Sequence, residues 1–474
     1  MCGVIGIISR ARDVIGDARI LLNAENNRGE QACGAAVFDG KTTRYYHGAG
    51  KVSEVFGRRD QIEWSKLVGP ACVMHCLYST VGSGGEKEQP KTRQPVPFTF
   101  HSQEGAVSHN GNLVRTDDLR EEAKQAGYVF ESETSDTEVI AALLSTSKKG
   151  DFIEALIDVL KKIEGKGAFS LVILYGDRLY GVRDQNEVRP LCIIKKHGEG
   201  ADSDSYIFAS ESSVFPNLEA TRFIRDVDIG ELVVLGADGI ERSIKWTNRT
   251  RPAFCVCELI YLMNPASRHR GVSAYAFRVK AGQISARNHP VMANVVSPIP
   301  ESGRGYDRGF SSVSGIPSGD GFVKSRYTLG GNRTFMRGRE IDRSKQQPLQ
   351  ANPDVMAGKN VVLTEDSIFR ASVAPKAVRM AKEHGYARAV HLRVCSPPVC
   401  HCCHLGIDTP TEKELIASHM TPSQIRDEII HTDSLEYLSV DELKQVLAEL
   451  GLDPNDFCLG CFTGEYPVPP PDER

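Results

Sequence analysis

The first roughly 240 residues alternate short apolar runs with turn residues, a pattern typical of β-strands. The clearest runs are VIGII, GAAVF, ACVMHCLY, GAVSHNG, FSLVILYGDRLYGV and YIFAS. Between them, apolar positions with helical spacing predict helices over 137–147 and 152–163. The polar, turn-like residues around 244–252 end this pattern and predict a domain boundary there.

The second half of the chain has a different rhythm, which predicts a βαβ unit. An apolar strand over 361–363 runs into an acidic loop, a helix follows and ends near Gly385, and ARAVHLRV is the next strand. This order implies a parallel sheet. A capping box that begins at Ser439 predicts a helix that stops at Gly451. Residues 300–350 are rich in Gly, Ser and Arg without clear periodicity, so we expect a mobile active-site loop or a disordered insertion.

Length and composition narrow the class of protein. A chain of 474 residues is too long for one ordinary core and predicts two or three domains. The net charge of −4 gives no positive excess for nucleic acid or an anionic membrane, and no apolar run approaches the ~20 residues that span a bilayer. The opening residues lack the basic stretch and long apolar core of a secretory signal. We therefore expect a cytoplasmic protein with no nucleic acid or membrane as partner.

Cys2 follows the initiator Met directly, and a small second residue permits removal of that Met. The thiol would then lie beside its own α-amino group, whose pKa of about 8 lets it act as a general base. Thiolate chemistry needs such a base, because an unassisted cysteine is mostly protonated at neutral pH. From the residue alone, the alternative is a small buried side chain at the start of a strand.

Five segments, in chain order, resemble those of the class II, N-terminal-nucleophile glutamine amidotransferases. They are MCGVIGI at the start, NRGE at 27–30, HCLYST at 75–80, HNGN at 109–112 and SDTE at 135–138. The resemblance implies that Cys2 is the nucleophile and that the Asn110 side chain and the Gly111 backbone N–H stabilise the oxyanion. It also implies a set of residues that bind glutamine: Arg28, Tyr78, Thr80 and Asp136, the last of which holds the α-amine.

One position departs from this family's pattern. Leu77 stands where the family has an arginine that holds the α-carboxylate of glutamine. A charged hydrogen bond of that kind contributes about 1.5–3 kcal/mol. Either Arg28 or another cation compensates, or glutamine is a poor substrate.

The acidic loop after 361–363 resembles the phosphoribosyl diphosphate fingerprint of type I phosphoribosyltransferases. Paired carboxylates at a strand end can hold two ribose hydroxyls, and the next loop offers backbone N–H groups to the 5′-phosphate; a solvated acidic loop is the alternative. PIPESG at 298–303 resembles the family's diphosphate loop, and KSRY at 324–327 its flexible catalytic loop. The resemblance implies this set of ligand-binding residues: Glu301, Ser302, Gly303, Lys324, Arg326, Glu365, Asp366, Ser367, Arg370 and Ser372. Mg²⁺ is expected at Glu365 and Asp366. Ala371 and Val373 replace a glycine and a threonine of the family.

The chain has 13 cysteines, and eight of them lie in its second half, which in a reducing compartment favours metal binding. Cys458 and Cys461 have the C-x₂-C spacing of metal ligands, although a redox dithiol has the same spacing. With Cys255 and Cys403 they resemble the ligands of a [4Fe–4S] cluster. Zinc is the alternative, because spacing does not separate the two and His401 and His404 lie nearby in sequence. The remaining cysteines of this half are expected to be buried thiols near the cluster: Cys257, Cys395, Cys400 and Cys402.

These segments together cover nearly the whole chain and resemble the amidophosphoribosyltransferase family, in its iron–sulfur form, with this chain as a divergent member. The resemblance implies an N-terminal-nucleophile αββα sandwich over 2–245, a type I phosphoribosyltransferase α/β domain over 246–474, and a homo-oligomer, either a dimer or a tetramer. It implies that ammonia released from glutamine displaces pyrophosphate from C1 of phosphoribosyl diphosphate, which gives phosphoribosylamine for purine synthesis. The departures at Leu77 and 371–373 leave two alternatives. One is a paralogue that uses free ammonia or another acceptor, and the other is a non-catalytic iron–sulfur scaffold.

Overall fold

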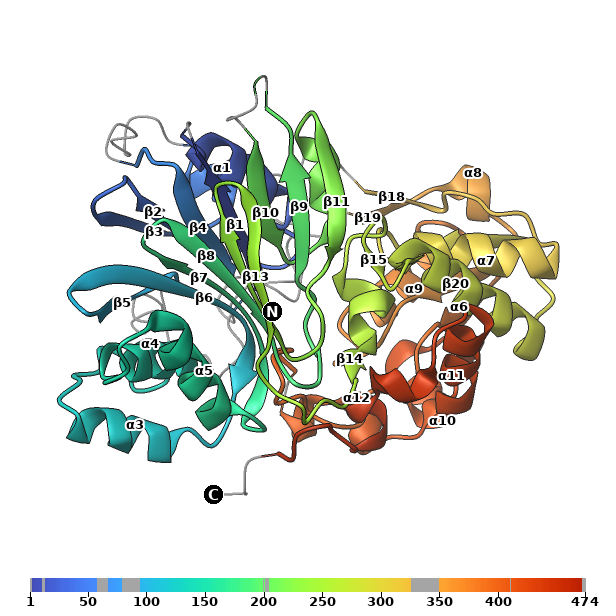
Figure 1. Cartoon of the computed structure of the whole chain (residues 1–474). Coiled ribbons are helices and arrows are strands. Elements are labelled where there is room, and N and C mark those ends of the chain that lie inside the picture. Colours follow the sequence, from blue (N-terminus) through green and yellow to red (C-terminus); the bar gives the residue numbers. More distant parts are fainter. Residues whose placement is uncertain are drawn as a thin grey trace. The chain divides into compact units, whose positions relative to one another are not determined.

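The computed structural model describes residues 2–10, 13–57, 67–78, 94–198, 200, 204–324, 349–409 and 411–470 (Figure 1). The chain divides into two compact units. The first unit contains Met1–Phe254 together with His404–Asp408 and Pro467–Arg474, and the second contains Cys255–Cys403 and Thr409–Tyr466. The predicted boundary after residue 245 lies shortly before this division. Within the described ranges, no helix is long and apolar enough to cross a membrane.

Two antiparallel sheets form the centre of the first unit. The first sheet has the order β11-β9-β10-β1-β4-β2-β3, and the second has the order β13-β12-β8-β7-β6-β5. The strands of the first sheet are β1 (Gly3–Ser9), β2 (Ala32–Phe38), β3 (Thr43–Ala49), β4 (Ala71–Leu77), β9 (Cys192–Lys196), β10 (Ser205–Ala209) and β11 (Thr221–Asp226). Those of the second are β5 (Val96–Phe100), β6 (Gln103–Leu113), β7 (Gly167–Tyr175), β8 (Arg178–Arg183), β12 (Glu231–Gly236) and β13 (Gly239–Lys245).

Three apolar clusters show that the first unit has four layers. Val4 and Val73 of the first sheet share a buried cluster with Val172 and Leu235 of the second, so these two faces pack together. The other face of the first sheet packs on α1 (Ile15–Ala24) and α2 (Val52–Val55). The other face of the second sheet packs on three helices: α3 (Asp117–Gln125), α4 (Asp136–Ser145) and α5 (Phe152–Ile163). The αββα sandwich and the two helices predicted here are confirmed.

A four-stranded parallel sheet forms the centre of the second unit. Its order is β17 (Val295–Pro298), β20 (Asn360–Glu365), β21 (Ala389–Val394) and β22 (Ser434–Tyr437). The predicted βαβ unit is β20, α9 (Ala374–Glu383) and β21, with β20 and β21 parallel. The capping box at Ser439 is also confirmed, because its side chain accepts from the Glu442 N–H at the start of α11 (Val440–Glu449).

The expectation that 300–350 is without regular structure is wrong for α7 (Arg304–Ser314). Only two large apolar side chains of α7 are buried, Tyr306 and Phe310, which is too narrow a stripe to show as periodicity. Its glycines allow close packing on α6 (Ala274–Asn288), because a Cβ at Gly309 would lie 1.9 Å from the Val279 carbonyl oxygen. The glycines disfavour a helix by themselves, but they permit this close packing on α6, and the packing stabilises α7.

The described chain also contains further short strands and α-helices. They are β14 (Phe254–Cys255), β15 (Arg268–His269), β16 (Val272–Ser273), β18 (Phe322–Lys324), β19 (Leu349–Ala351), α8 (Pro353–Met356), α10 (Pro422–Gln424), β23 (Phe457–Cys458) and α12 (Gly460–Thr463).

Candidate active sites

Cys2 lies immediately before β1 and is 5% exposed. Its backbone N–H donates to Asn110 Oδ1 at 3.3 Å, and its thiol contacts the Tyr78 carbonyl oxygen at 3.8 Å. Asn110 belongs to β6 and Tyr78 directly follows β4. The fold therefore brings three predicted site residues, distant in sequence, to one place in the first unit.

Asn110 presents an unused donor beside the nucleophile. Its Oδ1 is engaged by Cys2, whereas its Nδ2 is buried and has no hydrogen-bond partner in the described part of the chain. A buried amide N–H₂ without a partner is costly, and such a group is commonly kept for a ligand. Gly111 follows it, and a Cβ there would lie 2.0 Å from the Ala168 carbonyl oxygen, so only glycine fits. This arrangement can stabilise an oxyanion.

Asp136 is held as a carboxylate at the start of α4. Its Oδ2 accepts from the Leu113 N–H at 2.8 Å and lies 3.4 Å from His109 Nδ1. Burial alone would raise the pKa of Asp136, but the charge of His109 and the hydrogen bonds to the carboxylate lower it. Burial likewise opposes a charged His109, yet Asp136 raises the pKa of that imidazole. His109 was within a recognised segment, but only the structure shows its role in holding Asp136.

The other predicted glutamine-binding residues differ in what surrounds them. Tyr78 donates from its hydroxyl to Asp408 Oδ2 at 3.5 Å. Arg28 is 2% exposed, and its guanidinium is paired with Glu211 at 2.9 Å. Leu77, the last residue of β4, supplies no cation, and Thr80 lies outside the described residues. A role for Arg28 in glutamine binding stays a prediction.

In the second unit, Glu365 ends β20 and Asp366 follows it. Glu365 is 8% exposed, and its Oε2 has no hydrogen-bond partner among the residues that the structure describes. Burial, and then the charge of Asp366, raise the pKa of Glu365 well above its usual value. Asp366 Oδ1 accepts from the Ser367 hydroxyl at 2.9 Å. A buried acid without a donor fits a site whose ligand brings hydroxyls or a cation.

The predicted diphosphate loop lies against the same strand. The Ile299 N–H donates to the Thr364 carbonyl oxygen at 3.0 Å, and the Thr364 hydroxyl donates to the Gly303 carbonyl oxygen at 3.1 Å. Glu301 is paired with Arg304, a cation that the sequence analysis did not single out. Because the sequence pattern does not predict α7, nothing in the sequence marks Arg304 as the first residue of a helix beside this loop. The structure thus brings residues 298–303 next to Glu365.

The structure describes some, but not all, of the remaining residues of the predicted phosphoribosyl diphosphate site. Lys324 ends β18, whereas Arg326 lies outside the described residues. Arg370 Nε lies 3.4 Å from Glu414 Oε1. Ala371 has φ +50°, a left-handed conformation that favours glycine. Glycine adopts this backbone conformation without strain, whereas the Cβ of Ala371 makes it costly.

The four predicted cluster cysteines and Cys257 all lie in the second unit. The Cys257 thiol interacts through hydrogen bonds with Cys255 and Cys461, and Cys461 interacts in the same way with Cys403. The charge of Cys458 also acts on Cys461. This all-thiol donor set suits iron or zinc chemically. Across the described ranges, however, no three His, Cys, Asp or Glu side chains are arranged to hold a metal ion.

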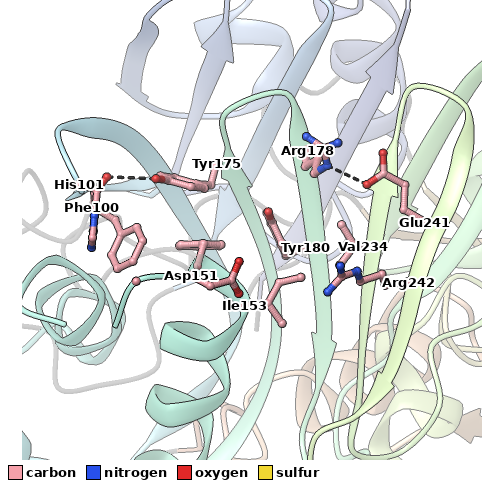
Figure 2. Close-up of a pocket in the computed structure, with 12 residues that line it drawn as sticks. Phe100, His101, Asp151, Ile153, Tyr175, Arg178, Tyr180, Val234, Glu241 and Arg242 are labelled. Carbon is pink, nitrogen blue, oxygen red and sulfur yellow. Dashed lines mark hydrogen bonds and ion pairs between the residues drawn. The ribbon is translucent and has the colours of Figure 1, made fainter. Parts of the chain in front are cut away.

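A cavity of about 440 Å³ lies elsewhere in the first unit (Figure 2). Packed aromatic rings line it, among them Phe152 and Tyr175, whose centroids are 4.1 Å apart. Arg178 at its edge is paired with Glu241. No predicted site residue lines this cavity, so it is separate from the site at Cys2.

Three comparisons with known proteins agree with this geometry. Residues 87–217 match a family model described as a glutamine amidotransferase domain. The chain is 37% identical to an amidophosphoribosyltransferase of Methanocaldococcus jannaschii over 99% of this chain and 98% of the relative. It is 36% identical to an amidophosphoribosyltransferase of Synechocystis sp. over 99% and 92% of the two chains. The solved glutamine phosphoribosylpyrophosphate amidotransferase of B. subtilis, complexed with ADP and GMP, matches with a TM-score of 0.85 and 32% identity over 98% of this chain and 97% of that one. The chain therefore belongs to the amidophosphoribosyltransferase family.

Proposed function

We propose that this chain transfers the amide nitrogen of glutamine to C1 of phosphoribosyl diphosphate and so makes phosphoribosylamine for purine synthesis. The main support for the proposal is that each candidate site has one buried polar group without a hydrogen-bond partner, a donor at the first site and an acceptor at the second, within the described residues. Asn110 Nδ2 is a buried donor without a partner beside Cys2, and Glu365 Oε2 is a buried acceptor without one beside the loop 298–303, within the described residues.

At the first site, removal of Met1 would free the α-amine of Cys2 to take the thiol proton. The thiolate then attacks the amide carbon of glutamine, and the Asn110 side chain and the Gly111 N–H hold the oxyanion. The α-ammonium of Cys2 gives its proton to the leaving nitrogen as this intermediate collapses, which releases ammonia and leaves a thioester that water hydrolyses to glutamate. Asp136 holds the α-ammonium group of glutamine during these steps.

At the second site, ammonia attacks C1 of the sugar, the bond from C1 to the diphosphate oxygen breaks, and a proton leaves the new amine. Glu365 and Asp366 accept hydrogen bonds from the ribose hydroxyls, and residues 298–303 with Lys324 hold the diphosphate. Ser367, Arg370 and Ser372 belong to the loop proposed for the 5′-phosphate. Mg²⁺, when bound near Glu365 and Asp366, would balance the diphosphate charge.

A second candidate function follows from Leu77. Without an arginine at this position, the α-carboxylate of glutamine lacks a charged hydrogen bond of about 1.5–3 kcal/mol. Arg28 is already engaged by Glu211, which favours a weak affinity for glutamine. The second candidate is thus the same transfer with free ammonia as the nitrogen donor.

We further propose a [4Fe–4S] cluster on Cys255, Cys403, Cys458 and Cys461, a homo-oligomer, and a cytoplasmic location. The cluster is supported by the all-sulfur donor set of these four residues and by the C-x₂-C spacing of Cys458 and Cys461. No disulfide joins the 13 cysteines in the part of the chain that the structure describes, which is typical of a reducing compartment. Iron and acid-labile sulfide in anaerobically purified protein would support the cluster, whereas colourless, zinc-loaded protein would overturn it.

A turnover assay tests the proposed function. Pyrophosphate release is measured with phosphoribosyl diphosphate and either glutamine or ammonium as the nitrogen source. Release with both supports the proposal. Release with ammonium alone supports the second candidate, and no release with either, together with no binding of phosphoribosyl diphosphate by calorimetry, overturns both.

A further inference from the structure

The first unit buries Arg28, whose side chain contacts the backbone of Cys2. Arg28 Nε donates to the Cys2 carbonyl oxygen at 3.0 Å, and Arg28 NH1 lies 2.9 Å from Glu211 Oε1. The Asn27 side chain donates to the same Glu211 oxygen at 2.7 Å. The position of the Cys2 backbone therefore depends on how Glu211 is held.

Glu25 contacts this group from the end of α1. It is fully buried, and its Oε1 accepts from the Glu211 backbone N–H at 2.9 Å. Its Oε2 lies over Gly3, since a Cβ at Gly3 would be 2.7 Å from this oxygen, and it has no hydrogen-bond partner within the described ranges. Glu25 thus reaches Cys2 by two routes, through Glu211 and Arg28 on one side and through Gly3 on the other.

Two carboxylates and one guanidinium share this buried space. Burial raises the pKa of Glu25 well above its usual value; Arg28 opposes this shift and the charge of Glu211 adds to it. The charge of Glu25 also acts on the thiols of Cys76 and Cys192, whose pKa values burial raises. With Glu25 protonated, Arg28 and Glu211 balance each other and the group is neutral. An extra negative charge here would favour the protonated form of the nearby α-amine, which then could not take the thiol proton.

We propose that Glu25 is a positioning residue for the glutaminase reaction: its hydrogen bond to the Glu211 N–H fixes Glu211 and thereby holds Arg28 on the Cys2 carbonyl. This inference rests on the proposed role of Cys2 as nucleophile. Glu25 touches neither glutamine nor the reacting thiol. Its loss changes the placement and the proton affinity of the thiol–amine pair rather than the binding of glutamine.

The test compares Glu25→Gln, Glu25→Ala and a control in the full-length enzyme. Glu231→Gln is the control, because Glu231 is also buried and paired with an arginine, Arg225 at 2.7 Å, in β12. The measurements are kcat and KM for glutamine, ammonia-dependent turnover, and the rate of Cys2 alkylation by a chloroketone analogue of glutamine across pH.

We expect Glu25→Gln to stay within about twofold of wild type, because it keeps the acceptor and the neutral charge. We expect Glu25→Ala to lower kcat and the alkylation rate by at least about tenfold with little change in KM, since small displacements of a reacting group are costly. The pH profile of alkylation should also shift in Glu25→Ala, because a displaced α-amine takes the thiol proton less readily even though no charge is removed. Ammonia-dependent turnover should be unchanged in every variant, and Glu231→Gln should behave as wild type.

Wild-type alkylation kinetics in a folded Glu25→Ala variant would overturn the inference, as would a Glu25→Gln variant as impaired as Glu25→Ala. If Glu25→Ala does not fold, Glu25→Asp replaces it: it keeps the carboxyl group but is one methylene shorter. Slow alkylation of Glu25→Asp then supports the inference, and normal alkylation overturns it. A wild-type enzyme that is not alkylated at Cys2 overturns the proposed nucleophile itself, which distinguishes failure of the proposed function from failure at Glu25.

Discussion

The two candidate sites differ in the kind of group that each leaves unpaired. At the site in the first unit the unpaired buried group is a donor, Asn110 Nδ2, and at the site in the second unit it is an acceptor, Glu365 Oε2, within the described chain. Around Asn110, the neighbouring site groups are engaged: Cys2 N–H by Asn110 Oδ1, and Asp136 by the Leu113 N–H. At Glu365, burial and then the charge of Asp366, another acid, disfavour the ionised carboxylate.

This difference matches the charge that each reaction develops. A donor held in a dry site is prepared for an oxyanion that exists only during the reaction. A buried acceptor beside a second acid is unfavourable until a ligand brings hydroxyl donors or a cation. In the proposed mechanism, the first site is therefore formed before glutamine binds, whereas the second is completed by bound phosphoribosyl diphosphate.

Cys2→Ser gives the largest expected effect and tests whether the two sites act independently of each other. Loss of the thiolate should lower glutamine-dependent turnover by at least about 10³-fold, because the attacking group itself is removed. Ammonia-dependent turnover should persist, since the second site does not use the thiol. Steady-state assays with each nitrogen source check this; equal loss of both activities would contradict two independent sites.

Asn110→Ala tests the unpaired donor directly. Removal of one oxyanion donor should lower kcat for glutamine about 10²- to 10³-fold with a much smaller change in KM. Asn112→Ala is the matched control on the same strand, because the Asn112 side chain donates to the His404 carbonyl oxygen at 2.9 Å. It should cost about 1 kcal/mol of stability rather than activity. A raised KM with normal kcat in Asn110→Ala would show that this amide binds the ground state instead.

How much of this was predictable from the sequence depended on how local the signal was. The helix 152–163 has apolar residues at regular spacing, and α5 has these same bounds. Cys2 and Asn110 were grouped from recognisable segments, although they lie 108 positions apart. Glu25 was missed, because an acidic residue beside Asn26 looks solvated until its partner Glu211, 186 positions away, is folded onto it. The helix α7 was missed for a similar reason, since its glycines are explained only by the close approach of the α6 backbone.

Glu365→Gln sharpens the second half of the comparison. We expect affinity for phosphoribosyl diphosphate to fall about 10- to 100-fold, the loss of a charged hydrogen bond. The free energy of unfolding of Glu365→Gln should, in contrast, be higher than that of the wild type. The raised pKa means that folded Glu365 keeps a proton that the unfolded chain releases, so wild-type stability falls as pH rises above the unfolded pKa of about 4.5.

The Gln variant does not suffer this fall, so its gain in free energy of unfolding should be larger at about pH 8 than at about pH 5. Calorimetry with phosphoribosyl diphosphate and urea unfolding at the two pH values measure both effects. A Gln variant that is destabilised more at high pH than at low pH would contradict an unpaired acid at this site.

Ala371→Gly has the smallest expected effect and asks whether the second site carries strain besides unpaired charge. Ala371 has φ +50°, and a residue with a Cβ in this region costs about 1 kcal/mol relative to glycine. Glycine here should raise the free energy of unfolding by about that amount, partly offset by its greater freedom in the unfolded chain. Ala381→Gly, in the interior of α9 at an ordinary helical position, should lower it by about 1 kcal/mol. Because the loop is the one proposed to meet the 5′-phosphate, the gain in Ala371→Gly should come with tighter binding of phosphoribosyl diphosphate. A gain in stability without tighter binding would mean that the strain at Ala371 is a feature of the backbone alone and that the ligand does not complete this part of the site.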